Sequence, residues 1–297
     1  MATCNSESTV ARAVTSVLNQ DFSNLELLVF DSQSSDQTRE ILCDFARGDK
    51  RIRLYLHSER IPWIANAHLG LRRASGKYFM FLDADDYIAS NYFSQLMEKQ
   101  QIEHSIGAFG RLFHCDNVGS LVTDHPAFGR AFVFAEDMSR HERISQMILT
   151  PDMYGAVNLL YSLWLTSELR EIGLWSEANE RRDSDYLFCL RALARGRISS
   201  EPGTWICRSM NQVMVSCQDT RNTYPPIDCR SVSSCKALVS DWTFPYLVQI
   251  FRYARNDWRN WTVVLPVLVR ICLAIFALPK RCVRRFTSTR NVRSTHG

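Results

Sequence analysis

The chain has 297 residues, a length that suits one large domain with an appendage, and 46% of them are apolar, enough to build a core. Six Lys or Arg and no acid follow residue 279, so subtracting them from the formal net charge of +4 leaves residues 1–279 at about −2. A near-neutral body argues against a nucleic-acid-binding protein, and a basic tail suits contact with an anionic surface.

Helix and strand patterns alternate through the N-terminal third of the chain. After a very short first strand, apolar residues at helical spacing predict a helix over residues 10–18, capped by Asn5 or Ser6. The next predicted elements are a strand over 25–30, a helix around 41–45, a strand over 52–56, a helix over 64–74 that Gly76 ends, and a strand over 78–82. This order predicts an α/β fold in which right-handed crossovers join parallel strands.

The second half of the chain is less regular. Its patterns predict a helix over residues 91–100, a strand over 106–114, a loop or hairpin over 117–137, a strand over 157–161, a helix over 185–194 that Gly196 ends, and an extended segment over 198–207.

Three carboxylates follow the predicted strand 78–82 almost at once: Asp83, Asp85 and Asp86. Open α/β sheets bind ligands at the carboxyl ends of their strands. Carboxylates this close repel one another unless a cation or hydrogen-bond donors hold them. A divalent cation such as Mg²⁺ or Mn²⁺, bridging to substrate phosphates, is one explanation. A solvated acidic turn that caps the next helix is the other.

Four blocks of sequence occur in a recognisable order. They are Asn5-Ser6-Glu7 continuing through residues 16–20 to 25–31, the loop Asp31-Ser32-Gln33-Ser34-Ser35-Asp36-Gln37-Thr38, residues 74–78 leading into 81–86, and Ser184-Asp185-Tyr186 ahead of Leu190-Arg191 and Gly196. Together they resemble the family 2 glycosyltransferases, the first three blocks more specifically than the fourth. The resemblance implies the GT-A fold, a Rossmann-like mixed sheet flanked by helices. It also implies an inverting, metal-dependent transfer of sugar from a nucleotide diphosphate sugar to a saccharide or lipid-linked acceptor, in the synthesis of envelope polysaccharide or glycolipid.

The resemblance assigns roles to individual acids. Glu7, Asp31 and Asp83 would bind the nucleotide sugar, Asp31 through the nucleobase and Asp83 against the nucleoside. Asp85 would coordinate a Mn²⁺ or Mg²⁺ ion that bridges both phosphates and offsets charge on the leaving group. Asp31 could instead only form a turn, and Asp86 could assist the metal site or cap the following helix.

The catalytic base is assigned through the fourth block. Aligning Leu190-Arg191 and Gly196 with the family places Asp185 on the catalytic aspartate, which would accept the proton of the acceptor hydroxyl. Ser184 stands where the family usually has glutamate. Asp183 is the alternative base, and Asp183 and Ser184 could also merely cap a helix. The segment Arg208-Ser209-Met210-Asn211 lacks the histidine that some relatives use as a further metal ligand.

The predicted organisation is a glycosyltransferase domain over residues 1–240, with a nucleotide-binding half over about 1–100 and an acceptor half over about 101–215, then an extension over 241–297. The 16 residues 263–278 are the most hydrophobic segment, with Trp261 ahead of them and basic residues after them. About 20 residues are needed to span a bilayer, so the segment suits the interface of an anionic leaflet. A marginal span, or a helix packed on the domain or a partner, remain alternatives.

Ten cysteines without a Cys-x-x-Cys pair, and an opening without an apolar core segment, predict a cytoplasmic protein, peripheral at the inner face of the cytoplasmic membrane. Two other functions compete with sugar transfer. One is a glycosyltransferase-like protein that binds nucleotide without turnover, motivated by Ser184 and the short first strand. The other is a dinucleotide-binding oxidoreductase, which would need a Gly-x-Gly-x-x-Gly loop that the chain does not contain.

Overall fold

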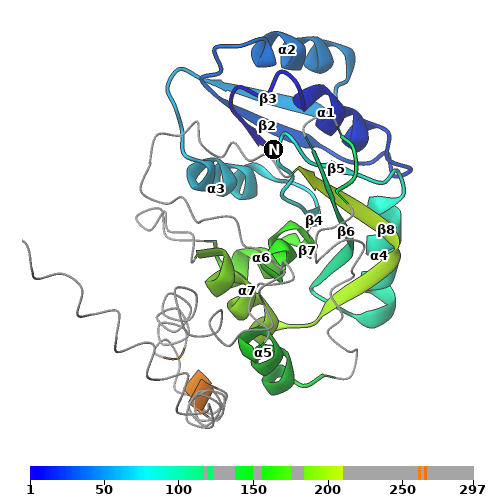
Figure 1. Cartoon of the computed structure of the whole chain (residues 1–297), viewed down its shortest axis with the longest axis vertical. Coiled ribbons are helices and arrows are strands. Elements are labelled where there is room, and N and C mark those ends of the chain that lie inside the picture. The colour runs from blue at the N-terminus through cyan, green and yellow to red at the C-terminus, as the bar shows by residue number, and fades with distance from the viewer. Residues whose placement is uncertain are drawn as a thin grey trace, which may run out of the picture.

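A computed structural model describes residues 1–116, 119–122, 138–149, 156–174 and 184–209, together with Ala254, Asn260, Trp261, Val264 and Leu265. Helices surround two sheets within this part of the chain, one of three strands and one of five (Figure 1). The predicted α/β class and the mixed sheet flanked by helices are confirmed.

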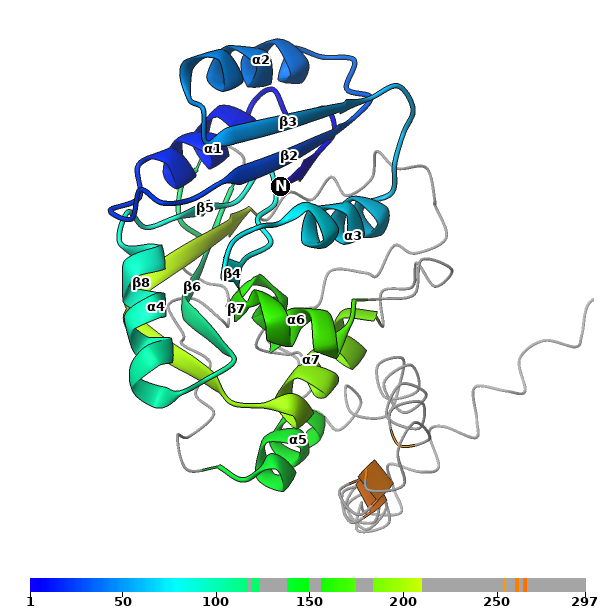
Figure 2. The same cartoon turned by 180° about the vertical axis from the view of Figure 1, so that it is seen from behind.

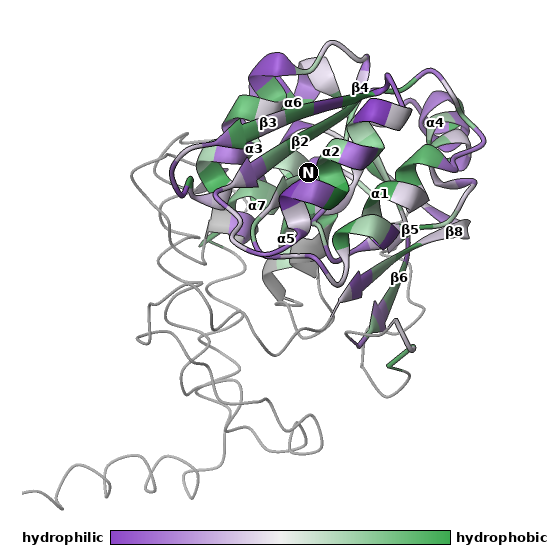
Figure 3. Cartoon of the chain, turned by 90° about the horizontal axis from the view of Figure 1, so that it is seen from above, coloured by the Kyte–Doolittle hydropathy of each residue, from purple (hydrophilic) through white to green (hydrophobic). Residues whose placement is uncertain are grey.

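The first sheet is parallel and has the strand order β1-β2-β3. Its elements, with the helices that connect them, are β1 (Ala2–Thr3), α1 (Val10–Leu18), β2 (Leu27–Ser32), α2 (Thr38–Gly48), β3 (Ile52–His57) and α3 (Trp63–Arg73). Every residue of the central strand β2 is buried. The helices α2 and α3 lie on opposite sides of this sheet (Figures 1 and 2). Hydrophilic and hydrophobic residues alternate along the helices that cover it (Figure 3), as an amphipathic helix requires.

The second sheet has the order β4-β7-β6-β8-β5, and only its β6–β8 pair is parallel. Its strands are β4 (Tyr78–Phe79), β5 (Tyr87–Ile88), β6 (Gly107–Cys115), β7 (Leu163–Leu165) and β8 (Ile198–Ser209). The remaining elements are α4 (Tyr92–Glu103), α5 (Arg140–Leu149), the 3₁₀ helix η1 (Ala156–Tyr161), α6 (Thr166–Ile172) and α7 (Ser184–Arg195). After α3 the chain therefore leaves the parallel sheet and builds the second sheet, whose strand β5 packs against α1.

The predicted parallel strand over 78–82 is wrong in both length and direction. Only Tyr78 and Phe79 pair, and they run antiparallel to β7. The apolar character of the run comes from burial instead, because Phe81 packs its ring between Phe79, at 4.9 Å, and Trp63, at 5.8 Å. The parallel order is thus confirmed for the first three strands and ends before the acids.

Two predicted helix ends are also wrong. The N-cap residue of α1 is Thr9, because Asn5 and Ser6 lie in an earlier turn. Asn5 has a φ of 51°, and its side-chain oxygen accepts a hydrogen bond from the backbone N–H of Ser35 at 2.9 Å. At the end of α3 the chain becomes extended at Ala74, with ψ at 132°, so Gly76 is not the residue that ends this helix.

In the second half, the helix α7 and the strands β6 and β8 confirm the predictions for 185–194, 106–114 and 198–207. The strand predicted over 157–161 is wrong, because these residues form η1 and the strand β7 follows it. The helices α5 and α6 were not predicted. Most of the predicted loop or hairpin over 117–137 lies outside the described residues.

A buried tryptophan connects the helices of this half to the second sheet. Trp164 on β7 is fully buried, and its indole N–H donates to the carbonyl oxygen of Leu160 at 3.0 Å. Its ring meets Phe188 of α7 edge-on at 5.5 Å. The same ring lies 2.9 Å from the position that a Cβ on Gly107 would occupy, so β6 can approach β7 only with glycine there. Through Trp164, these contacts connect α7 to the segment that carries Tyr161.

Candidate active site

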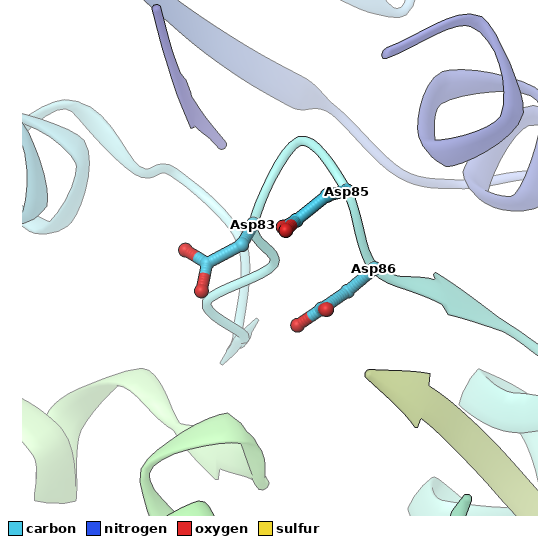
Figure 4. Close-up of side chains that lie close together, drawn as sticks. All are labelled: Asp83, Asp85 and Asp86. Atoms are coloured by element: carbon cyan, nitrogen blue, oxygen red, sulfur yellow. The ribbon is translucent and has the colours of Figure 1, made fainter. Parts of the chain in front are cut away.

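The three clustered acids occupy the turn between β4 and β5, which we call the acid loop, Asp83 to Asp86 (Figure 4). Each of Asp83, Asp85 and Asp86 offers an oxygen that lies within 4.8 Å of the others. Asp83 and Asp85 are partly exposed, whereas Asp86 is 1% exposed. Oxygen donors at this spacing fit a hard divalent cation such as Mg²⁺ or Mn²⁺.

Asp86 joins the acid loop to the end of β8. One carboxylate oxygen accepts the backbone N–H of Ser209 at 2.9 Å, and the other accepts Nε of Arg208 at 2.9 Å. Burial raises the pKa of Asp86 to about 7, with Asp83 and Asp85 adding to the rise and Arg208 opposing it. Because β5 follows Asp86 and Asn91 is the N-cap residue of α4, the predicted helix-capping role of Asp86 is wrong.

Asp83 is held by three side chains from distant parts of the chain. The indole N–H of Trp63 donates to one oxygen at 3.0 Å. The hydroxyl of Tyr161 donates to the other at 2.6 Å, and Arg208 Nη2 donates to that same oxygen at 3.2 Å. No pattern in the sequence pointed to Trp63 or Tyr161, because both reach the acid loop only through tertiary contacts.

Arg208 is the central cation of this cluster. Its guanidinium carbon lies 3.9 Å from the centroid of the Tyr161 ring, and Nη2 donates to the Tyr161 oxygen at 3.0 Å. Burial alone would lower the pKa of Arg208, but Tyr161, Asp86 and Asp83 raise it above its ordinary value. Burial also raises the pKa of Tyr161. Near neutral pH the guanidinium is therefore a fixed positive charge beside the acids.

The backbone at Asp85 is fixed from α1. Arg12 Nη2 donates to the carbonyl oxygen of Asp85 at 3.2 Å, and the guanidinium lies 4.7 Å above the ring of Tyr87. The loop is therefore anchored on both sides of Asp85 through groups other than its own carboxylate. Asp86 is buried, whereas Asp83 and Asp85 are partly exposed, so these two carboxylates are the ones that a metal ion could reach.

Of the two other acids predicted to bind the donor, Glu7 lies in the turn after β1, and Asp31 is the penultimate residue of β2. Asp31 is fully buried and accepts the backbone N–H of Ser34 at 3.1 Å, the hydroxyl of Ser34, and Nε of Arg39 at 2.6 Å. Glu7 accepts the backbone N–H of Gln37 at 2.9 Å. Both acids therefore organise the loops at the carboxyl ends of the parallel strands, and their contact with a nucleotide stays a prediction.

Asp185 lies in the first turn of α7 and is partly buried. Its carboxylate is not part of the group formed by Asp83, Asp85 and Asp86. The competing acids Glu177, Glu180 and Asp183 lie outside the described residues. The helix is connected to the acid loop through η1, since α7 packs on η1 and Tyr161 of η1 contacts Asp83.

Comparison with known sequences matches residues 1–157, just over half of the chain, to the model of the Glycosyl transferase family 2. An uncharacterized glycosyltransferase of Haemophilus influenzae is 30% identical over 122 residues, covering 41% of this chain and 49% of the relative. The UDP-Glc:alpha-D-GlcNAc-diphosphoundecaprenol beta-1,3-glucosyltransferase WfgD of Escherichia coli is 37% identical over 126 residues, with the same two coverages of 41% and 49%. This chain thus spans about half the length of these curated relatives.

Solved structures show the same fold at low sequence identity. The S. aureus protein TarS, residues 1–349, superposes with a TM-score of 0.55 in its complex with UDP, at 20% identity over 70% of this chain and 58% of TarS 1–349. Its complex with UDP-GlcNAc gives the same TM-score of 0.55 at 21% identity, covering 72% of this chain and 59% of that one. The likeness supports the GT-A fold, and the family match places the acid loop within the matched segment. The chain belongs to family 2 of the glycosyltransferases.

Proposed function

We propose that this chain transfers a sugar, with inversion, from a nucleoside diphosphate sugar to a hydroxyl of a saccharide or lipid-linked acceptor, in the synthesis of envelope glycans. The observation that carries the proposal is the acid loop, a cluster of carboxylates between two strands of the mixed sheet, in a chain of this family. The names of the E. coli relative and of a Campylobacter jejuni relative, 37% identical over 98 residues, both describe undecaprenol-linked substrates.

In this proposal Asp83 and Asp85 hold a Mn²⁺ or Mg²⁺ ion and the donor, with Glu7 and Asp31 supporting the nucleotide. The ion would supply positive charge to the diphosphate as it leaves. Asp83 is oriented by Trp63 and Tyr161, and Asp85 by the contact of its backbone with Arg12. Such pre-arranged groups stabilise developing charge without having to reorganise during the reaction.

The base of the proposed reaction is Asp185. An inverting transfer needs a carboxylate that takes the proton of the acceptor hydroxyl on the face of the sugar opposite the leaving group. Asp185 is on a helix rather than a loop, and Phe188, one turn further along, is locked against Trp164. A rigid support of this kind is what a positioned base requires.

The proposal is tested by calorimetric titration of the full chain with UDP, GDP and dTDP, each with and without Mn²⁺. We expect one of the three nucleotides to bind more tightly when Mn²⁺ is present, since the metal and the diphosphate would complete each other's coordination. A folded protein that binds none of the three under either condition would refute a donor site of this class.

We propose that the chain contacts an anionic membrane surface through a C-terminal extension, which begins at residue 241 after a catalytic domain over residues 1–240. Asn260 and Val264 are buried, and Arg140 of α5 donates to Asn260 Oδ1 at 2.6 Å. Trp261 and Leu265, one helical turn apart, are 37% and 56% exposed. The described helices include none that is long and apolar enough to cross a bilayer. A docked segment with an outward Trp-Leu pair, followed by basic residues, suits the interface of an anionic leaflet.

Deleting residues 280–297, which carry the six basic residues of the tail, is expected to reduce co-sedimentation with vesicles that contain anionic lipid, most strongly at low salt. The double substitution Trp261→Ala and Leu265→Ala should reduce binding at any salt concentration, because it removes apolar contacts. Ile102→Ala is the matched control, since Ile102 is 67% exposed but lies on α4. Binding of the full chain that none of these changes affects, or no binding at all, would refute the proposed surface.

A further inference from the structure

Arg208 is fixed more firmly than binding to a single acid would require. It is the penultimate residue of β8, and its side chain, 22% exposed, is held at three points. Nε pairs with the buried Asp86, Nη2 pairs with Asp83, and the guanidinium lies over the ring of Tyr161. A surface ion pair is held by one partner and contributes little, whereas a guanidinium restrained on three sides is a preorganised charge.

This charge lies at the acids that would bind the metal. Asp83, Asp85 and Asp86 carry a formal charge of −3 when ionised, and Arg208 brings the cluster to −2, which one divalent cation balances. At the effective dielectric constant of a partly buried site, charges separated by several ångströms interact strongly enough to change affinities by about tenfold or more. Arg208 therefore repels an incoming metal ion and attracts an incoming diphosphate.

We propose that Arg208 is a built-in cation of the donor site, which shares with the divalent metal the neutralisation of the diphosphate and lowers the affinity of the acid loop for the metal alone. The inference rests on the proposed function. It adds a second positive charge to the donor site, one that is present whether or not the metal is bound. Asp86 and Tyr161 are then positioning residues for Arg208. This role explains why the acid loop contains a third, buried carboxylate, that of Asp86, in addition to the two that would hold the metal.

A purely structural ion pair would give a different result from a charge-sharing cation. Losing a structural pair loosens the loop, so metal and nucleotide affinity fall together. Losing a charge-sharing cation moves the two affinities in opposite directions. We therefore expect Arg208→Gln to bind Mn²⁺ alone about tenfold more tightly, and to bind UDP, or whichever nucleotide the wild type prefers, about tenfold more weakly at saturating Mn²⁺.

The experiment is calorimetry of the full chain with MnCl₂ alone and then with nucleotide. Arg208→Lys keeps the charge and should leave the Mn²⁺ affinity within about twofold of wild type. Arg53→Gln is the matched control, because Arg53 also pairs with an acid, Glu26, but on β3 away from the acid loop. A folded Arg208→Gln protein whose Mn²⁺ affinity is unchanged or weaker would overturn the proposal.

Asp86, left without its cation in the Arg208→Gln protein, could prevent folding, which circular dichroism would show. The double variant Asp86→Asn with Arg208→Gln removes both charges of the buried pair. It should bind Mn²⁺ about as tightly as wild type and nucleotide more weakly, and unchanged nucleotide affinity would overturn the proposal. If the wild type binds no nucleotide, the proposed function fails, while the titrations with Mn²⁺ alone still decide whether Arg208 opposes the metal.

Discussion

Replacement of Asp85 by Ala is expected to abolish Mn²⁺-dependent binding of nucleoside diphosphate and to leave the fold intact. The carboxylate is one of the two partly exposed acids that can hold the metal, so its loss removes a charged ligand. The contact that anchors the loop at this point is made by the backbone carbonyl of Asp85 with Arg12, and an alanine retains that carbonyl. The substitution should therefore remove the metal ligand and keep the backbone contact with Arg12.

The measurement is calorimetric titration of wild type and Asp85→Ala with the preferred nucleotide, with and without Mn²⁺, alongside thermal unfolding. The melting temperature should change by only a few degrees, as is usual for a substitution at a partly exposed position. Asp44→Ala is a suitable control, because the Asp44 side chain on α2 is 60% exposed and pairs only with the neighbouring Arg47 among the ion pairs of the described residues. Unchanged affinity in a folded Asp85→Ala protein would remove Asp85 from the metal role and leave Asp83 as the candidate.

Local sequence was sufficient for the parallel sheet and for the place of the acids. The helix α1 carries apolar residues at helical spacing, the strand β2 is a continuous apolar run, and the three acids lie within four positions of the chain. The end of the parallel sheet was not predictable in this way. Residues 78–82 have the composition of a buried strand, but burial can come from ring packing as well as from strand pairing, and composition does not distinguish the two.

The groups that hold the acid loop are long-range contacts. Tyr161 reaches Asp83 across 78 positions in the sequence, and Arg208 reaches Asp86 across 122. Neither residue belongs to a pattern that local reasoning can read, and the segment of Tyr161 was predicted as a strand although it forms the 3₁₀ helix η1. The sequence did show that no histidine is present at 208–211, but only the structure shows a guanidinium beside the acids.

Replacement of Asp185 by Asn is expected to preserve donor binding and to reduce sugar transfer by about 10²- to 10⁴-fold, the usual contribution of a positioned general base. Asparagine has nearly the same shape and can keep a hydrogen bond, but it cannot accept a proton at neutral pH. The packing of α7 through Phe188 and Trp164 is untouched by the change, so the helix should keep its place. Donor affinity by calorimetry and turnover with a nucleotide sugar and an undecaprenol-linked saccharide measure the two effects separately.

The control for Asp185→Asn is Glu168→Gln, a second amide substitution of an acid, on α6, where Glu168 pairs with Arg195 of α7 at 2.7 Å. It should leave both donor affinity and transfer close to wild type, since an exposed ion pair contributes little.

Undiminished transfer by Asp185→Asn would shift the role of base to Asp183, which the corresponding Asp183→Asn protein would then reveal. If the wild type binds the donor but neither transfers nor hydrolyses it, and Asp185→Asn binds it equally well, the site is one that retains nucleotide binding without turnover. In that case Ser184 would be the first residue to replace, by the glutamate that the family usually has there. Among the differences between this chain and its family, this missing carboxylate is the one next to the proposed base, Asp185.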